Sequence, residues 1–194
     1  MSRVTTFSRH FPTHHPRCGK HTYFVEQILN SLGMDFRTDW YWGQLQKWNP
    51  DVNVTTLSKF YNSLYWDCRT KKHHTIRNGQ SWKPGMVFSP RVWSFTPYNS
   101  PQITFAPDVT LKSIVPVCIE QYGKHGLLVI NSKDDGSIVT MLPLDVVAKN
   151  DGLESNDFIG WFATSKLKNG INFNGQIRIW DNGTDYISKN GITG

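Results

Sequence analysis

Residues 71–93 read KKHHTIRNGQSWKPGMVFSPRVW, and this stretch mixes cationic, hydroxyl-bearing and aromatic side chains. It carries the ammonium group of Lys72, the hydroxyl of Thr75, the guanidinium of Arg77 and the indole of Trp82. Aromatic rings stack on the faces of nucleobases, and cationic groups pair with phosphates. The stretch therefore favours contact with a flat heterocycle that carries or adjoins an anionic group.

The composition of the whole chain is that of a folded protein with a basic surface. Its 194 residues suit one domain, or one domain with an elaboration. Hydrophobic residues make up 38% and charged residues 19%, so a packed core is expected. The formal net charge of +6 favours anionic partners such as RNA, DNA or nucleotides.

The cysteines and the hydropathy pattern bear on the compartment. Cys18, Cys68 and Cys118 are odd in number and far apart, so they predict reduced thiols rather than a disulfide framework or a zinc site. The N-terminus lacks the apolar run of a signal peptide, and no stretch approaches the roughly 20 apolar residues of a membrane span. We therefore expect a cytoplasmic protein without a membrane partner.

Hydrophobic periodicity and turn residues predict a mixture of helices and strands. The predicted helices cover residues 22–33 (with Thr22 as N-cap), 40–48, 55–64, 143–149 and 155–166. The predicted strands cover residues 3–8, 85–94, 102–106, 109–121, 126–132, 136–142 and 175–181. The order indicates a mostly helical N-terminal third, followed by a strand-rich body.

The pattern Lys72-x-x-Thr75-x-Arg77, followed by Lys83-Pro84-Gly85 before a strand, resembles the signature of the ASCH family of PUA-like β-barrels. The family has an aspartate after this Lys-Pro-Gly turn, where this chain has Met86. Two later segments, 149–162 and 173–180, resemble longer ASCH-type proteins of phages and prophages.

The resemblance implies an α+β fold, in which a PUA-like (ASCH) β-barrel has flanking helices and an N-terminal helical elaboration. The expected division places the elaboration at residues 1–69, packed on the barrel. The barrel itself covers residues 70–186, and residues 187–194 form a tail.

The resemblance also implies a catalytic set, because some members of the family are N4-acetylcytidine amidohydrolases. Their motif lysine and threonine correspond to Lys72 and Thr75, and Asp151 stands near the position of their glutamate. Lys72 can act as a base only if burial or neighbouring cations lower its pKa, and a nearby Asp151 carboxylate would oppose that. Two alternatives stay open. Lys72 and Thr75 can be ordinary strand-edge residues, and Asp151 can belong to a plain helix-terminating turn.

Further side chains around the motif are predicted to contact a ligand. They are His74, Arg77, Trp82, Arg91, Trp93 and Tyr98. Arg91 and Trp93 are two residues apart on a predicted strand, so they should share one face. The competing interpretation is that Trp93 and Trp82 pack in the core.

A histidine-rich loop precedes the first helix and contains His10, His14, His15, Cys18 and His21. These spacings can bind zinc, but prolines interrupt the segment and no second paired motif follows. We interpret it as a basic loop and expect neither a metal nor a cofactor.

Three functions are compatible with these patterns. The first is binding of a nucleobase or modified nucleotide, free or within RNA or DNA. The second is hydrolysis of an acylated cytidine. The third is a phage-encoded interaction protein that sequesters a nucleotide signal or a host defence factor, in which case the partner is a host protein and the location the host cytoplasm.

Overall fold

The computed structural model describes residues 2–35, 43, 46–47, 70–122, 126–132, 138–162, 173–181 and 186. The predicted helix at 55–64 and the predicted tail at 187–194 lie outside these residues. Most of the predicted helix at 40–48 also lies outside them.

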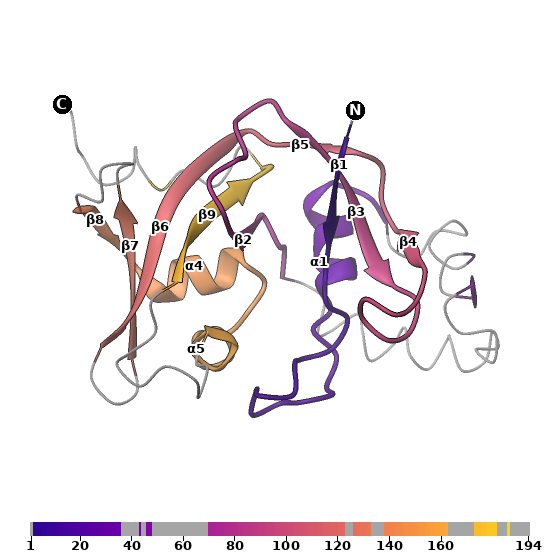
Figure 1. Ribbon diagram of the computed structural model, residues 1–194, viewed down its shortest axis with the longest axis horizontal. Helices are drawn as coiled ribbons and strands as arrows, with labels where there is room; N and C mark the ends of the chain where they lie inside the picture. The colour runs from indigo at the N-terminus through magenta and orange to yellow at the C-terminus, as the bar shows by residue number, and fades with distance from the viewer. Residues whose placement is uncertain are drawn as a thin grey trace.

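The described strands form two sheets, which occupy opposite halves of the view in Figure 1. The first sheet has four strands in the order β1-β3-β4, with β5 also paired to β3. Its strands are β1 (Arg3–Thr6), β3 (Val87–Trp93), β4 (Gln102–Thr104) and β5 (Val109–Thr110). The strand predicted at residues 3–8 is present as β1. It runs parallel to β3, so the N-terminal region contributes a strand to this sheet.

The second sheet has five strands in the order β2-β9-β6-β7-β8, and all its pairs are antiparallel. Its strands are β2 (His74–Asn78), β9 (Phe173–Ile179), β6 (Ser113–Tyr122), β7 (Gly126–Ser132) and β8 (Ile138–Leu142). Two helices, α4 (Leu144–Asn150) and α5 (Ser155–Phe162), pack against one face of this sheet (Figure 1). The helix α1 (Phe24–Ser31) lies beside the first sheet (Figure 1).

The predicted α+β class is confirmed by this arrangement. The described strands fall into two sheets with separate hydrogen-bond ladders, so the PUA-like barrel and its division at residue 69 stay predictions. None of the described helices combines the length and the apolar character needed to cross a bilayer.

Three local predictions need correction. The predicted strand at 109–121 is two strands, because the chain passes from the first sheet to the second between Leu111 and Lys112. The Leu111 N–H donates to the Met86 carbonyl beside the first sheet, and the Lys112 N–H donates to the Ile179 carbonyl of the second. The set of predicted strands omits β2, whose mixed polar and apolar residues hide its alternation. The N-cap of α1 is Tyr23, which has a positive φ of 58°, rather than Thr22.

Two hydrophobic cores flank the ladder between β2 and β9. One core packs β6 and the inner face of β9 against α4 and α5, with Ile76 and Phe158 among its members. The other packs β3 against α1, with Phe7 and Ile28 among its members. Burying each large apolar side chain contributes about 1.5–3 kcal/mol, so these cores fix the ladder in place.

Candidate functional site

Lys72 and Asp151 form a buried ion pair next to the start of β2. Lys72 is only 1% exposed, and its Nζ lies 2.5 Å from Asp151 Oδ1. The same ammonium group donates a hydrogen bond to the Asp151 backbone carbonyl and lies 4.1 Å from the ring centroid of Phe24. The predicted lysine–acid pair is therefore brought together.

Backbone hydrogen bonds hold this pair where three elements meet. The Lys72 N–H donates to the Gln27 carbonyl of α1, at 3.2 Å. The His73 N–H donates to the Asn150 carbonyl at the end of α4, at 2.8 Å, and Asp151 is the C-cap of that helix. The chain that enters β2 thus ties α1 to the turn between α4 and α5.

Burial dominates the electrostatics of the pair. It lowers the pKa of Lys72 to about 8, although the Asp151 carboxylate acts in the opposite direction. Burial also raises the pKa of Asp151 from its ordinary value, against the effect of Lys72. Both shifts follow from the desolvation of charges away from water.

His74 lies beside this pair and is fully buried. Its Nδ1 is hydrogen-bonded to the Tyr186 hydroxyl at 2.9 Å, and that hydroxyl accepts a bond from Asn150 Nδ2 at 3.0 Å. Its Nε2 lies 3.8 Å from Asp151 Oδ1, too far for a good hydrogen bond. Burial and the Lys72 charge hold the pKa of His74 well below its usual value, so the ring is neutral at neutral pH.

Thr75 and Arg77 point to the opposite face of β2 from His74, because side chains alternate along a strand. Arg77 Nη2 donates to the Thr6 carbonyl of β1 at 2.5 Å. Among the described residues, the Thr75 hydroxyl makes no hydrogen bond, whether to Lys72, to Asp151 or to any other group. The third member of the predicted catalytic set is therefore not joined to the other two.

The predicted aromatic contacts divide between the core and the surface. Trp82 is 8% exposed and belongs to the core of the first sheet. Trp93 lies on the face of β3 opposite Phe88, with its ring centroid 5.4 Å from that of Tyr98, which is 84% exposed. Arg91 shares this face with Trp93, as predicted, and its Nε lies 3.4 Å from Ser89 Oγ. These surface residues lie on the first sheet, whereas Lys72 and Asp151 adjoin the second.

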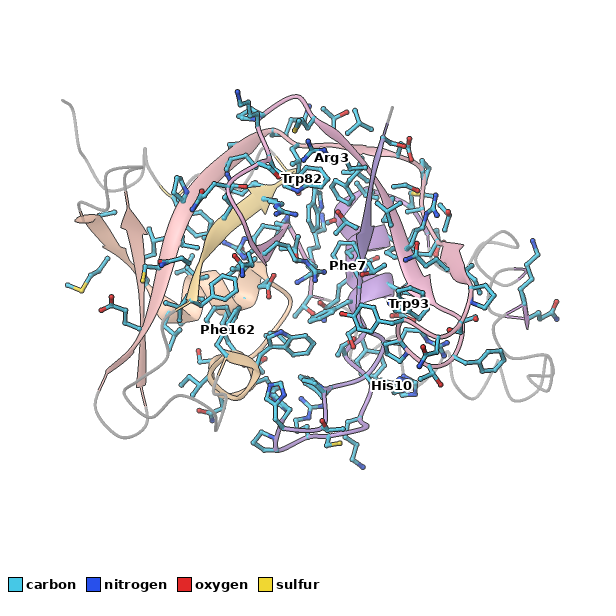
Figure 2. The ribbon with its side chains drawn as sticks, in the orientation of Figure 1. Arg3, Phe7, His10, Trp82, Trp93 and Phe162 are labelled. Carbon is cyan, nitrogen blue, oxygen red and sulfur yellow. The ribbon has the colours of Figure 1, made fainter. Side chains whose placement is uncertain are left out.

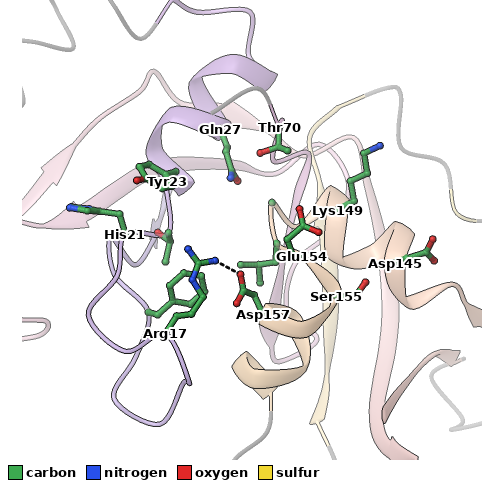
Figure 3. A pocket seen from close by; sticks show the side chains of 14 residues that line it. Arg17, His21, Tyr23, Gln27, Thr70, Asp145, Lys149, Glu154, Ser155 and Asp157 are labelled. Carbon is green, nitrogen blue, oxygen red and sulfur yellow. Dashed lines mark hydrogen bonds and ion pairs between the residues drawn. The ribbon is translucent and has the colours of Figure 1, made fainter. Parts of the chain in front are cut away.

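A cleft of about 600 Å³ opens beside the Lys72–Asp151 pair. Figure 3 shows its walls: α1 and the preceding loop on one side, with Tyr23 and Gln27, and α4 and α5 on the other, with Lys149 and Asp157. None of the predicted site residues lines it. The pair lies next to the cleft, because Gly152, which lines it, follows Asp151 directly.

Gln27 lines this cleft with a polar atom that is buried and has no hydrogen-bond partner among the described residues. It is 4% exposed, and its carboxamide makes no hydrogen bond within the described part of the chain. Its Oε1 lies over Gly152, where a Cβ built on that glycine would sit 1.9 Å away. Sequence reasoning missed Gln27, and the only available signal was an amide three residues after Phe24 and next to Ile28 on a predicted helix.

The histidine-rich loop forms one end of the cleft by docking on α5. His14 Nε2 lies 3.1 Å from the Trp161 carbonyl, and His15 Nε2 lies 2.9 Å from the Asp157 carbonyl. Arg17 completes the contact with an ion pair of 2.5 Å to the Asp157 carboxylate. In the described ranges no three His, Cys, Asp or Glu side chains lie close enough together to hold a metal ion.

Comparison with known proteins gives no relative from which to assign this site. No protein-family model, no curated protein and no solved structure significantly matches the chain.

Proposed function

We propose that the protein binds the base of a nucleotide or modified nucleoside in the cleft beside Lys72 and Asp151. The observation that carries this proposal is the Oε1 atom of Gln27, which is buried without a hydrogen-bond partner in the described structure, on a side chain that lines the cleft. A glutamine side chain offers a donor and an acceptor side by side, which matches the paired polar edge of a base. A buried polar group left without a partner costs about 1–3 kcal/mol, and a bound base would remove that cost.

The rest of the cleft supports the same ligand class. Its volume lies within the roughly 300–1,000 Å³ of small-molecule sites. The rings of His21 and Tyr23 line one wall, with centroids 5.9 Å apart, and both residues are partly exposed. Stacking of a base on such a ring contributes about 1–3 kcal/mol. Lys149 supplies a cation on the opposite wall, where a phosphate can follow the base.

Within this proposal the ASCH-type motif supports the cleft instead of lining it. Lys72 binds the Gln27 carbonyl through its backbone and Asp151 through its side chain, so it fixes the spacing between α1 and Gly152. Lys72 is thus a positioning residue for the Gln27 carboxamide. Membership of the ASCH group of PUA-like proteins remains part of the proposal and rests on the motif resemblance.

The proposal is tested by calorimetric titration of the protein with cytidine, N4-acetylcytidine, adenosine, guanosine and uridine. We expect one base class to bind, and Gln27→Met to weaken that binding roughly tenfold or more because the amide contacts are lost. Gln102→Met is the matched control, because Gln102 lies on β4 of the first sheet and does not line the cleft. Equal affinities of wild type and Gln27→Met, or no binding by the folded protein, would overturn the proposal.

The amidohydrolase function remains the second candidate because of one observation. Burial brings the pKa of Lys72 to about 8, which is close to the range of a working general base. The chemistry would also need a hydroxyl, for which Thr75 is the motif residue. Incubation with N4-acetylcytidine and chromatography for free cytidine tests it. Turnover that Lys72→Met abolishes would establish the activity, and no turnover by the folded wild type would exclude it.

A further inference from the structure

The face of the β2–β9 ladder that looks away from α4 and α5 carries two arginines, a threonine and a glutamine. Thr75 is paired with Arg178, and Arg77 with Gln176, across the antiparallel ladder. Directly opposed residues of a ladder point to the same face, so these four side chains emerge together. They face the first sheet, because Arg77 lies 5.4 Å from the ring of Phe7 and Arg178 lies 4.6 Å from the ring of Trp82.

A third guanidinium approaches the same place. Arg3 of β1 lies 5.2 Å from the ring centroid of Trp82, on which Arg178 also rests. Figure 2 shows Arg3 and Trp82 side by side, with Phe7 further along the chain, just past the end of β1. The pKa of Arg178 is lowered to about 10, mainly by burial and further by the charges of Arg77 and Arg3. The contribution of these two arginines indicates that the like charges are close.

No described acidic side chain contacts the two ladder arginines, although the Asp151 charge acts on Arg77 from a distance and raises its pKa against the effect of burial. Within the described ranges, neither Arg77 nor Arg178 forms an ion pair with an aspartate or glutamate. Their hydrogen bonds go to the backbone carbonyls of Thr6 and Asn78. The Nε atoms of both side chains are buried and have no hydrogen-bond partner in these ranges. Arg178 as a whole is only 7% exposed. Burying like charges without a counterion is costly, so an additional anion would be strongly favoured here.

Two hydroxyl groups complete the surroundings. Thr75 is 5% exposed, and its hydroxyl makes no hydrogen bond among the described residues. Thr5 of β1 is also 5% exposed, and its Oγ1 is buried without a partner. Thr5 lies two residues from both Arg3 and Phe7, so in extended chain its side chain shares their face and points toward the arginines. Hydroxyls and guanidinium forks together are the groups that bind phosphate oxygens.

We infer that Arg77, Arg178, Thr5 and Thr75 form a binding site for an oxyanion of the phosphate class between the two sheets. The side of the site near Arg3, which is exposed, offers the entry. The site is separate from the proposed base cleft, because its residues emerge from the opposite face of β2 and none of them lines that cleft. The inference of an oxyanion site therefore does not depend on the proposed function.

The inference is tested by titrating the intact protein with inorganic phosphate at constant ionic strength, with chloride as the reference. Binding is followed by calorimetry and by the midpoint of thermal unfolding. We expect phosphate to bind and to raise that midpoint, while chloride does not. Arg178→Met should weaken phosphate binding roughly tenfold or more, because a charged hydrogen-bonding partner is lost. Lys83→Met is the matched control, because Lys83 is an exposed cation next to Trp82.

Three further measurements complete the test. Without phosphate, Arg178→Met should unfold at the same or a higher temperature than wild type, because repulsion is relieved, whereas a purely structural arginine would lower it. If Arg178→Met does not fold, the isosteric Thr75→Val takes its place and should also weaken phosphate binding. A nucleoside 5′-monophosphate distinguishes the source of the anion: tighter binding than phosphate that Arg178→Met weakens and Gln27→Met does not indicates a nucleotide at this site, and equal binding indicates a free phosphate. Equal responses to phosphate and chloride, or unchanged phosphate binding in Arg178→Met, would overturn the inference.

Discussion

Lys72 Nζ and Asp151 Oδ1 lie 2.5 Å apart in the interior of the protein, although 79 positions separate the two residues in the chain. Each charge is almost entirely removed from water, so each depends on the other. The pair joins the entry of β2 to the end of α4, and the backbone of Lys72 joins both to α1. It therefore fixes the geometry of the neighbouring cleft.

Removing one member of this pair should destabilise the protein more than removing both. Lys72→Met and Asp151→Leu should each lower the free energy of unfolding by about 3–5 kcal/mol, because an uncompensated charge stays buried. The double variant should recover most of that loss, since two apolar side chains need no counterion. Urea denaturation of all four proteins measures the coupling. Additive losses in the double variant would show that the two side chains act independently.

The stability of the protein should depend on pH through Lys72. Its pKa is about 8 in the folded protein, below the ordinary 10.5 that it regains on unfolding. Between these values the unfolded state binds more protons, so the contribution of Lys72 to the free energy of unfolding rises with pH, by at most about 1.4 kcal/mol per unit. Urea denaturation from pH 8 to pH 10 should show this rise in wild type and its loss in Lys72→Met. Identical pH profiles would contradict the shifted pKa.

Gly152 should be required for binding in the cleft beyond its effect on stability. Its φ of 76° disfavours a side chain, and an added Cβ would displace the Gln27 carboxamide, which lies 1.9 Å from that position. Gly152→Ala should therefore cost about 1 kcal/mol of stability and also weaken nucleoside binding. Gly79→Ala is the control, because Gly79 has a φ of 88° but no atom within 4 Å of an added Cβ. Calorimetry should show reduced binding only for the first variant.

Salt should separate a free nucleoside from a polynucleotide ligand. A neutral nucleoside releases no counterions, so its affinity should change little between about 50 and 200 mM salt. RNA or DNA bound by this basic protein should lose affinity steeply over the same interval, because each phosphate contact releases a counterion. Fluorescence anisotropy with short labelled RNA and DNA strands measures the slope. A salt-independent affinity for these strands would mean that phosphates make no contact.

The sequence was sufficient for those elements whose pattern is local. The helices α4 and α5 and the strands β3, β6, β7, β8 and β9 all overlap the predicted ranges, because apolar spacing and turn residues mark them directly. The lysine–acid pairing at the candidate site was suggested only by the family motif. No local rule brings position 72 to position 151, since their contact depends on how β2, α1 and α4 pack.

The sequence by itself determined the basic charge, the α+β class, and the fact that His74 and Thr75 must point to opposite faces of any strand that contains them. Only the tertiary structure decided what each face meets. It placed His74 toward the Lys72–Asp151 pair and Thr75 opposite Arg178, and it buried Gln27 against Gly152. The physical reason is that alternation along a strand is local geometry, whereas register and burial are set by packing between segments far apart in the chain.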